Sequence, residues 1–234
     1  MSKSGPYNPL EKVNLGISVA EALLAQDEHS LEELQPFAGA GIYALYYQGG
    51  FDAYVKLAAI NKTQGSKVPI YVGKAIPEGG RKGLSPMIKT TMVQRSTKAL
   101  FKRLTEHAES IRSTGLSIQD FSCRYLVVDD IWIPLGESLM IARFSPLWNL
   151  LVDGFGNHDP GKGRYNGLVP KWDVLHPGRA WATKCQPRNE TAEQIAVEVQ
   201  AWLAQSPTLM QSRYVVREAE AEYKVSRFSS DADE

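Results

Sequence analysis

GIYALYY at residues 41–47 and VPIYV at residues 68–72 are the two stretches that decide the fold. Both are rich in β-branched and aromatic side chains, which are enriched in strands. Tyr43 lies near the start of the first stretch, and Tyr71 lies near the end of the second. We therefore predict two strands that each carry a tyrosine, although a single tyrosine in a strand is most often a packing residue.

Three patterns downstream predict helices, and one predicts a further strand. In residues 98–112 apolar residues recur at i, i+4, i+8 and i+11 from Leu100, which is the stripe of an amphipathic helix. Residues 134–144 begin with a proline, which favours the first turn of a helix. Residues 191–205 carry an apolar stripe, and residues 121–128 (FSCRYLVV) are typical of a third strand.

The remaining segments give weaker signals. Ser18 with Glu21, and Ser30 with Glu33, have the spacing of capping boxes and predict two short helices near the start. Residues 53–60 fit either a strand or a short helix. The three segments expected to be irregular are 75–97, 153–189 and the tail from about 229.

The composition favours one globular domain in a reducing compartment. The chain has 234 residues, of which 43% are hydrophobic and 22% charged. Its two cysteines, Cys123 and Cys185, exclude a disulfide framework and a cysteine zinc site. No apolar stretch is long enough for a transmembrane helix or a signal peptide, so we expect a cytoplasmic protein without membrane contacts.

The net charge of zero is a sum of opposed regions. Residues 74–103 carry eight basic side chains and one acid, Glu78, whereas residues 1–40 carry two basic and six acidic side chains. Residues 190–234 carry four basic and nine acidic side chains. A cationic middle is what a protein that binds a polyanion needs, although such clustering also arises by chance.

Two polar pairs, on or shortly after the predicted helices, are candidates for chemistry. Arg103 and His107 are four residues apart and share a helix face, where together they could hold a phosphate. Alternatively His107 could accept a proton, or both could belong to a solvated face. Glu137 and Asn149 stand among apolar residues, so each needs a partner, and Glu137 could bind a divalent cation.

Taken in order, these residues resemble the GIY-YIG nuclease superfamily. Gly41-Ile42-Tyr43 and Tyr71-Val72-Gly73 are similar to its two half-motifs, with valine in place of isoleucine at position 72. The later landmarks are Arg103, His107, Glu137 and Asn149, and the resemblance covers about residues 40–150. The 27 residues between Tyr43 and Tyr71, and the basic insertion at 75–98, resemble the type II restriction endonuclease branch.

The resemblance implies an α+β fold, in which a small, mostly antiparallel sheet is flanked by helices. The domain organisation we expect is an N-terminal helical extension at 1–39, the nuclease core at 40–152, and DNA-contacting loops and a helix at 153–234.

The resemblance also implies a reaction and roles for the residues. The reaction is Mg²⁺-dependent hydrolysis of a DNA phosphodiester, with one ion per site bound by Glu137. Arg103 would stabilise the charge on the phosphate, and Tyr43 would orient the attacking water. His107 could instead be the base, and that choice stays open. Tyr71 and Asn149 would complete the site by hydrogen bonds.

The expected partner is double-stranded DNA with a palindromic, GC-containing site, which implies a homodimer and a companion DNA methyltransferase. The residues we expect to contact DNA are Lys74, Arg81, Lys82, Lys89, Arg95, Lys162, Arg164 and Arg179. Two alternatives are a structure-specific or mobile-element nuclease of the same superfamily, and an inactive DNA-binding module.

Overall fold

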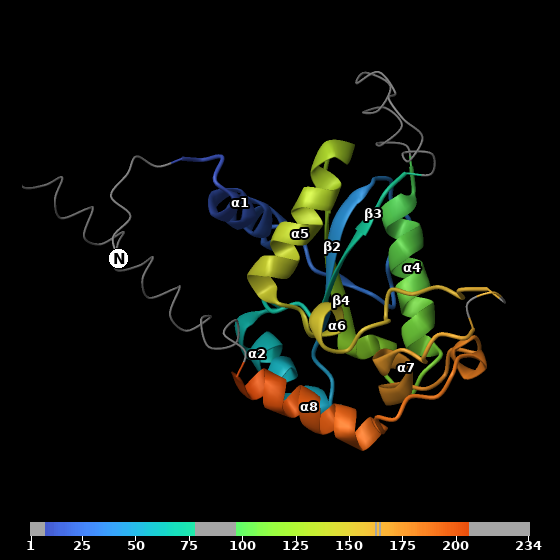
Figure 1. The fold of residues 1–234 in the computed structure, drawn as a ribbon. Coiled ribbons are helices and arrows are strands. Elements are labelled where there is room, and N and C mark those ends of the chain that lie inside the picture. The colour runs from blue at the N-terminus through green and yellow to red at the C-terminus, as the bar shows by residue number, and fades with distance from the viewer. Residues whose placement is uncertain (1–7, 78–96, 162, 164, 206–234) are drawn as a thin grey trace, which may run out of the picture.

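The computed structural model describes residues 8–77, 97–161, 163 and 165–205 (Figure 1). The strands are β1 (His29–Ser30), β2 (Gly41–Tyr47), β3 (Tyr71–Ala75) and β4 (Phe121–Val127). The α-helices are α1 (Lys12–Leu24), α2 (Val55–Gln64), α4 (Ala99–Arg112), α5 (Ile133–Phe144), α6 (Leu147–Leu150), α7 (Lys171–Leu175) and α8 (Ala192–Gln205). Short 3₁₀ turns are η1 (Asp52–Tyr54), η2 (Ile118–Asp120), η3 (Asp130–Trp132) and η5 (Ala182–Lys184).

The strands form one four-stranded sheet in the order β1-β4-β2-β3, and every pairing is antiparallel. The register places Tyr43 of β2 opposite Gly73 of β3 on one side and Tyr125 of β4 on the other. This mixed fold with a small antiparallel sheet confirms the fold class predicted from the sequence.

All seven residues of β2 are buried, because β2 has strand neighbours on both edges and helices on both faces. Alternate side chains of a strand point to opposite faces, so β2 supplies both layers of the core. Ile42, Ala44 and Tyr46 pack toward α1 and α5. Tyr43, Leu45 and Tyr47 pack toward α2, α4, α6 and α8 on the opposite face. In Figure 1, β3 lies between α5 and α4.

The N-terminal segment, whose helix α1 belongs to the first of these layers, differs from the prediction. The first helix begins at Lys12 rather than near Ser18, and Ser30 lies in the short strand β1 rather than at the start of a second helix. Packing decides where α1 runs, since Gly16 of α1 lies against the side chain of Leu139 in α5. A capping box is a local signal worth about 1 kcal/mol, and tertiary contacts override it.

The second layer contains the helices that periodicity predicts. The helices expected at 98–112 and 191–205 are found as α4 and α8, and α8 covers the core with Ile195, Val199 and Leu203. The ambiguous segment 53–60 is helical, because it spans η1 and α2. The structure therefore favours the helix over the strand for this segment.

The described residues of the segment 153–189 are irregular outside α7 and η5, and the segment is anchored to the core. His176, which follows α7, lies with Nε2 2.6 Å from the hydroxyl of Tyr54. The indole nitrogen of Trp148 donates to the same hydroxyl at 2.9 Å. Burial lowers the pKa of His176 to about 3, so this buried histidine is neutral at pH 7.

Arg179 is part of this anchor, which corrects its assignment as a DNA contact. Its side chain is buried, and its guanidinium forms an ion pair with the buried carboxylate of Asp173. The guanidinium also donates to the backbone carbonyls of Gly154, Phe155 and Asn157 at 2.9–3.1 Å. These protein groups already pair with the guanidinium, so Arg179 stabilises the backbone at residues 154–157.

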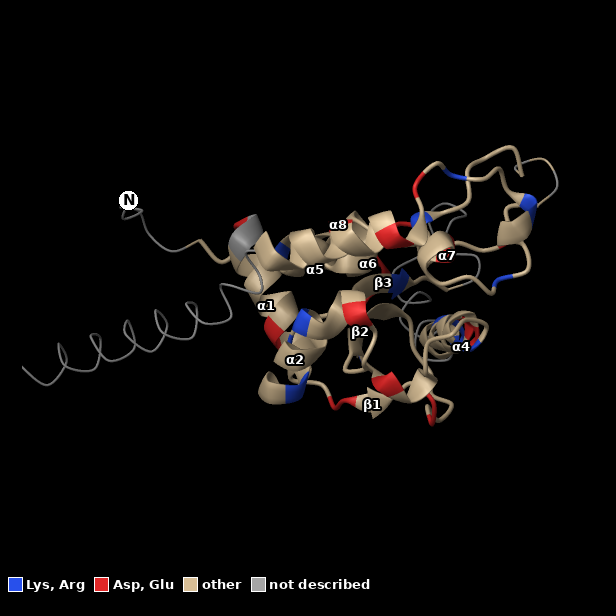
Figure 2. Ribbon diagram, turned by 90° about the horizontal axis from the view of Figure 1, so that it is seen from below, with Lys and Arg blue, Asp and Glu red and all other residues tan. Residues whose placement is uncertain are grey.

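Of the other residues expected to contact DNA, Lys74 is half-exposed at the edge of the sheet. Six of these residues, and the tail from 229, lie outside the described residues, namely Arg81, Lys82, Lys89, Arg95, Lys162 and Arg164. Figure 2 shows Lys and Arg along the described C-terminal loops, and Lys171 pairs with Glu198 at 2.8 Å.

No helix in the described part of the chain is both long enough and apolar enough to cross a membrane.

Replacement of Arg179 should destabilise the fold. In Arg179→Leu the carboxylate of Asp173 would stay buried without its partner, which typically costs about 3–5 kcal/mol. We expect urea denaturation to show a loss of that size in the free energy of unfolding. The control Lys184→Leu removes a half-exposed cation and should change the free energy of unfolding by less than about 0.5 kcal/mol. A loss below about 1 kcal/mol for Arg179→Leu would contradict the structural role.

Candidate active site

The pairing of β2 and β3 brings the two motif tyrosines together. The ring centroids of Tyr43 and Tyr71 are 6.3 Å apart, on the face of the sheet that α4 covers. The ring of Tyr43 crosses over Gly73, and a Cβ atom at Gly73 would lie only 2.3 Å from the hydroxyl oxygen of Tyr43. Any other residue at 73 would displace Tyr43, so glycine is required by this close approach.

Tyr43 is joined to α4 by a buried hydrogen bond. Its hydroxyl oxygen lies 2.6 Å from Nε2 of His107, and both side chains are almost completely shielded from solvent. His107 follows Leu104 by three residues, so it shares the buried face of α4 rather than a solvated one. The ring of Phe155 stacks on the imidazole, with 4.5 Å between the ring centroids, and covers the pocket that contains Tyr43 and His107.

Burial decides the charge of both groups. It raises the pKa of Tyr43 well above 10, and the neighbouring Tyr71 raises it further, against the opposing effect of Arg103. Burial lowers the pKa of His107 well below 6.5, and the charge of Arg103 lowers it further. At neutral pH the hydrogen bond therefore joins a neutral phenol to a neutral imidazole.

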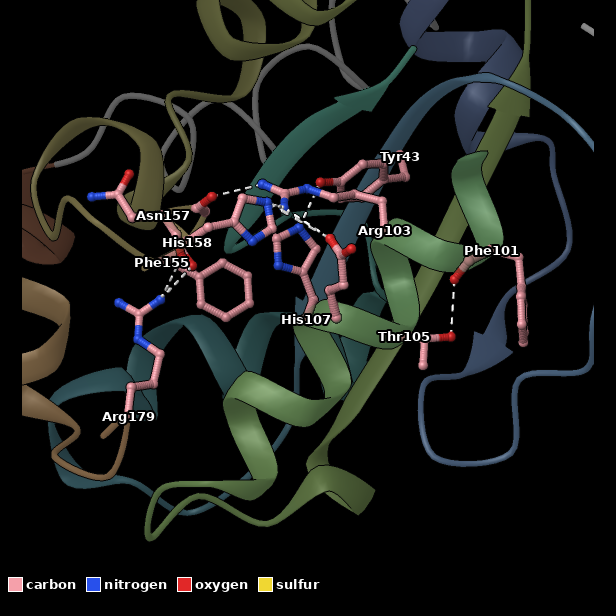
Figure 3. Close-up of polar contacts among 11 residues, drawn as sticks. Tyr43, Phe101, Arg103, Thr105, His107, Phe155, Asn157, His158 and Arg179 are labelled. Atoms are coloured by element: carbon pink, nitrogen blue, oxygen red, sulfur yellow. Dashed lines mark hydrogen bonds and ion pairs between the residues drawn. The ribbon is translucent and has the colours of Figure 1, made fainter. Parts of the chain in front are cut away.

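The guanidinium of Arg103 lies at the mouth of this pocket (Figure 3). Its Nη2 donates to the carbonyl oxygen of Gly156 at 2.6 Å, and its Nη1 pairs with Glu106 at 3.1 Å. The two groups therefore differ in their surroundings, and a joint hold on an anion stays a prediction. Arg103 is a cation at the surface of the site, whereas a buried neutral His107 is suited to proton transfer.

Glu137 lies on the other side of β3. Lys74 follows Gly73 in the strand and so points toward α5, where its ammonium forms an ion pair with the carboxylate of Glu137. The carboxylate is close enough to both tyrosines that its charge contributes to their raised pKa values, after burial, which is the main cause. The polar groups of the site thus surround the edge strand β3.

The residues around Glu137 fit a magnesium ion. In the described part of the chain no three His, Cys, Asp or Glu side chains are grouped as a metal cage. Mg²⁺ commonly keeps several waters and binds through one or two carboxylates and substrate phosphates. Glu137 supplies a single, partly accessible carboxylate, as that mode of binding requires, and its ion pair with Lys74 would have to open or shift for the ion to bind.

Asn149 holds the edge of the sheet in place. Its side-chain oxygen accepts from the backbone N–H of Val72 at 2.8 Å, and its side-chain nitrogen donates to the carbonyl of the same residue at 2.8 Å. These two bonds satisfy backbone groups that an edge strand would otherwise leave unpaired. Asn149 therefore fixes the strand that carries Tyr71 and Gly73.

A hollow of about 450 Å³ opens beside Arg103 and His107. Its wall includes Phe155, His158 and Trp181 from the C-terminal segment, which the sequence predicts only to contact DNA. His158 contacts Arg103 directly, and no sequence pattern singled it out. The only available signal was its place as one of four histidines, next to a glycine-rich stretch.

Comparison with known proteins agrees with this geometry. The chain has no significant match among curated proteins. A family model described as the Eco29kI GIY-YIG domain matches residues 35–203, which is most of the chain and includes every residue of the site. It extends past the core expected at 40–152 and so includes the C-terminal segment that contacts Arg103. The chain therefore belongs to the Eco29kI GIY-YIG family of type II restriction endonucleases.

Proposed function

We propose that this chain is a Mg²⁺-dependent endonuclease that hydrolyses phosphodiester bonds at a specific site in double-stranded DNA. The observation that carries the proposal is the buried hydrogen bond between Tyr43 and His107, with Arg103 beside it. An acid–base pair can take the proton of the attacking water, and a neighbouring cation can stabilise the charge on the phosphate.

Tyr43 and His107 act as a relay in this proposal. The hydroxyl of Tyr43 donates its proton to Nε2 of His107 while its oxygen accepts the proton of the attacking water. The relay avoids a free phenolate, which the raised pKa of Tyr43 makes costly. Because burial lowers its pKa, His107 is neutral across the neutral pH range and has a lone pair that can accept the proton, although the same burial makes it a weak base.

Access to Tyr43 requires a local movement. Its side chain has no exposed surface, and Arg103 hydrogen-bonds to it. The attacking water can reach the hydroxyl only when the covering groups move, and Arg103 is a long side chain that can turn toward a phosphate. Binding of DNA would thus move the guanidinium to where it stabilises the charge on the scissile phosphate.

Glu137 would hold the magnesium ion. Lys74 would either keep its ion pair with the carboxylate of Glu137 or bind the phosphate. When bound, Mg²⁺ would neutralise the scissile phosphate and stabilise the leaving 3′ oxygen. Tyr71 would complete the pocket by a hydrogen bond. Its pKa is raised by burial, so it remains a neutral donor at pH 7.

The target we propose is a palindromic, GC-containing site, cut by a homodimer in which each subunit hydrolyses one strand. A companion methyltransferase would protect the same site in host DNA. Both proteins would act in the cytoplasm, where that DNA is located.

Digestion of DNA of known sequence tests the proposal. We expect discrete fragments with Mg²⁺ and none with EDTA, and the mapped ends should share one palindrome. Preference for flaps or branches, or cleavage without a divalent ion, would contradict it.

Replacement of Glu137 tests the metal ligand. Glu137→Gln removes the charge and should lower cleavage at least about 100-fold while DNA binding, measured by mobility shift with Ca²⁺, is retained. The control Glu33→Gln changes an exposed carboxylate and should cleave as the unmodified chain does. Unchanged cleavage by Glu137→Gln would show that the ion is bound elsewhere.

The two buried tyrosine–histidine pairs provide a matched test of the relay. His107→Phe and His176→Phe each remove a hydrogen bond of 2.6 Å to a buried tyrosine, so both should lose some stability in thermal unfolding. Only His107→Phe should also lower the cleavage rate per folded molecule, by about 10²–10⁴-fold. Equal cleavage by the two folded variants would rule out proton transfer through His107.

The oligomeric state tests the symmetry. Sedimentation of the chain with a duplex that carries the mapped site should give a complex with two chains per duplex. A single chain that cuts both strands in one binding event would contradict the homodimer.

A further inference from the structure

The loop at residues 154–158, which we term the arm loop, belongs to the C-terminal segment yet contacts the active-site arginine at two points. The carbonyl oxygen of Gly156 accepts from Nη2 of Arg103 at 2.6 Å. Nε2 of His158 forms a hydrogen bond with Nη1 of the same guanidinium. Figure 3 shows His158 reaching Arg103 from this loop, on the side away from Arg179.

The arm loop is held rigidly where it meets the site. The buried guanidinium of Arg179 donates to the carbonyls of Gly154, Phe155 and Asn157, which are all in the loop. At Gly156 a Cβ atom would lie 2.5 Å from the hydroxyl oxygen of Tyr71, so the loop backbone packs closely against the second motif tyrosine. The loop is therefore a fixed support for the groups it carries.

The contact between His158 and Arg103 has a defined chemistry. A guanidinium has only donors, so Nε2 of His158 must be the unprotonated acceptor in this hydrogen bond. Nη1 of Arg103 also faces the carboxylate of Glu106, which lies 3.7 Å from Nε2 of His158. With the carbonyl of Gly156, these groups hold both terminal nitrogens of the guanidinium.

We propose that His158 is a positioning residue for Arg103, and this inference rests on the proposed nuclease function. The imidazole sets the orientation from which Arg103 reaches the scissile phosphate, and it does not itself touch the reacting atoms. The side chain of His158 is 65% exposed, so the contact adds little to the stability of the fold. A residue that contributes little to stability but restricts the orientation of the guanidinium should act mainly on the cleavage rate.

Two variants of His158 separate this role from a structural one. His158→Ala removes the acceptor, and an error of about 1 Å in a group that stabilises the transition state can cost about 100-fold. We expect the single-turnover cleavage rate at saturating DNA to fall about 10- to 100-fold. His158→Gln places an amide oxygen where Nε2 stands, so it should recover most of the rate. Affinity for DNA, measured with Ca²⁺, should change less than about threefold in both variants.

His29 provides the control, because it stacks on Tyr125 at 5.2 Å in the strand β1 at the opposite edge of the sheet from β3. His29→Ala should cleave as the unmodified chain does. Equal rates for His158→Ala and the unmodified chain would overturn the positioning role, as would a rate that falls only in proportion to DNA affinity or folded fraction. Failure of His158→Gln to recover the rate would overturn the acceptor role.

An unmodified chain that does not cleave DNA would instead refute the proposed function. The unmodified chain must therefore be assayed first, so that the two failures are distinguishable.

Discussion

The structure depends on one buried hydrogen bond, which joins Tyr43 of β2 to His107 of α4. Neither group can be left unpaired in the core, because a buried polar group without a partner costs about 1–3 kcal/mol. Neither can be charged, because burial raises the pKa of the phenol and lowers that of the imidazole. The bond therefore fixes how α4 sits on the sheet and requires a glycine at 73, over which the tyrosine ring passes.

The same kind of bond occurs twice among the described residues, and the two pairs differ in their surroundings. Tyr54 and His176 form a pair with the same 2.6 Å separation, and burial shifts both pKa values in the same directions. That pair is completed by Trp148 and is enclosed by apolar side chains. The pair at Tyr43 differs because Arg103 stands at its mouth and a hollow opens beside it. Only the pair at Tyr43 therefore lies beside a cation and a surface hollow.

Local patterns in the sequence predicted the elements whose own side chains determine them. The strand at 41–47 and the helices α4, α5 and α8 follow from β-propensity and apolar periodicity, and the family resemblance placed the motif residues in order. The errors concern long-range contacts. The capping box at Ser18 was overridden by packing on α5, and Arg179 could not be identified as buried because Asp173 and three carbonyls meet it only in the fold. His158 was missed because its partner, Arg103, lies 55 residues away.

The position of Arg179 changes how the C-terminal segment relates to the chemistry. A basic residue in a glycine-rich segment suggests a contact with DNA. Here the guanidinium of Arg179 instead donates to backbone carbonyls of the loop at 154–158, and that loop contacts Arg103 through His158. The segment expected to contact DNA thus reaches one of the groups expected to cleave it, because its loop at 154–158 contacts Arg103. A change in that loop would be transmitted to the guanidinium through the carbonyl of Gly156 and the ring of His158. Under the proposed function, these contacts between protein groups would join recognition to cleavage.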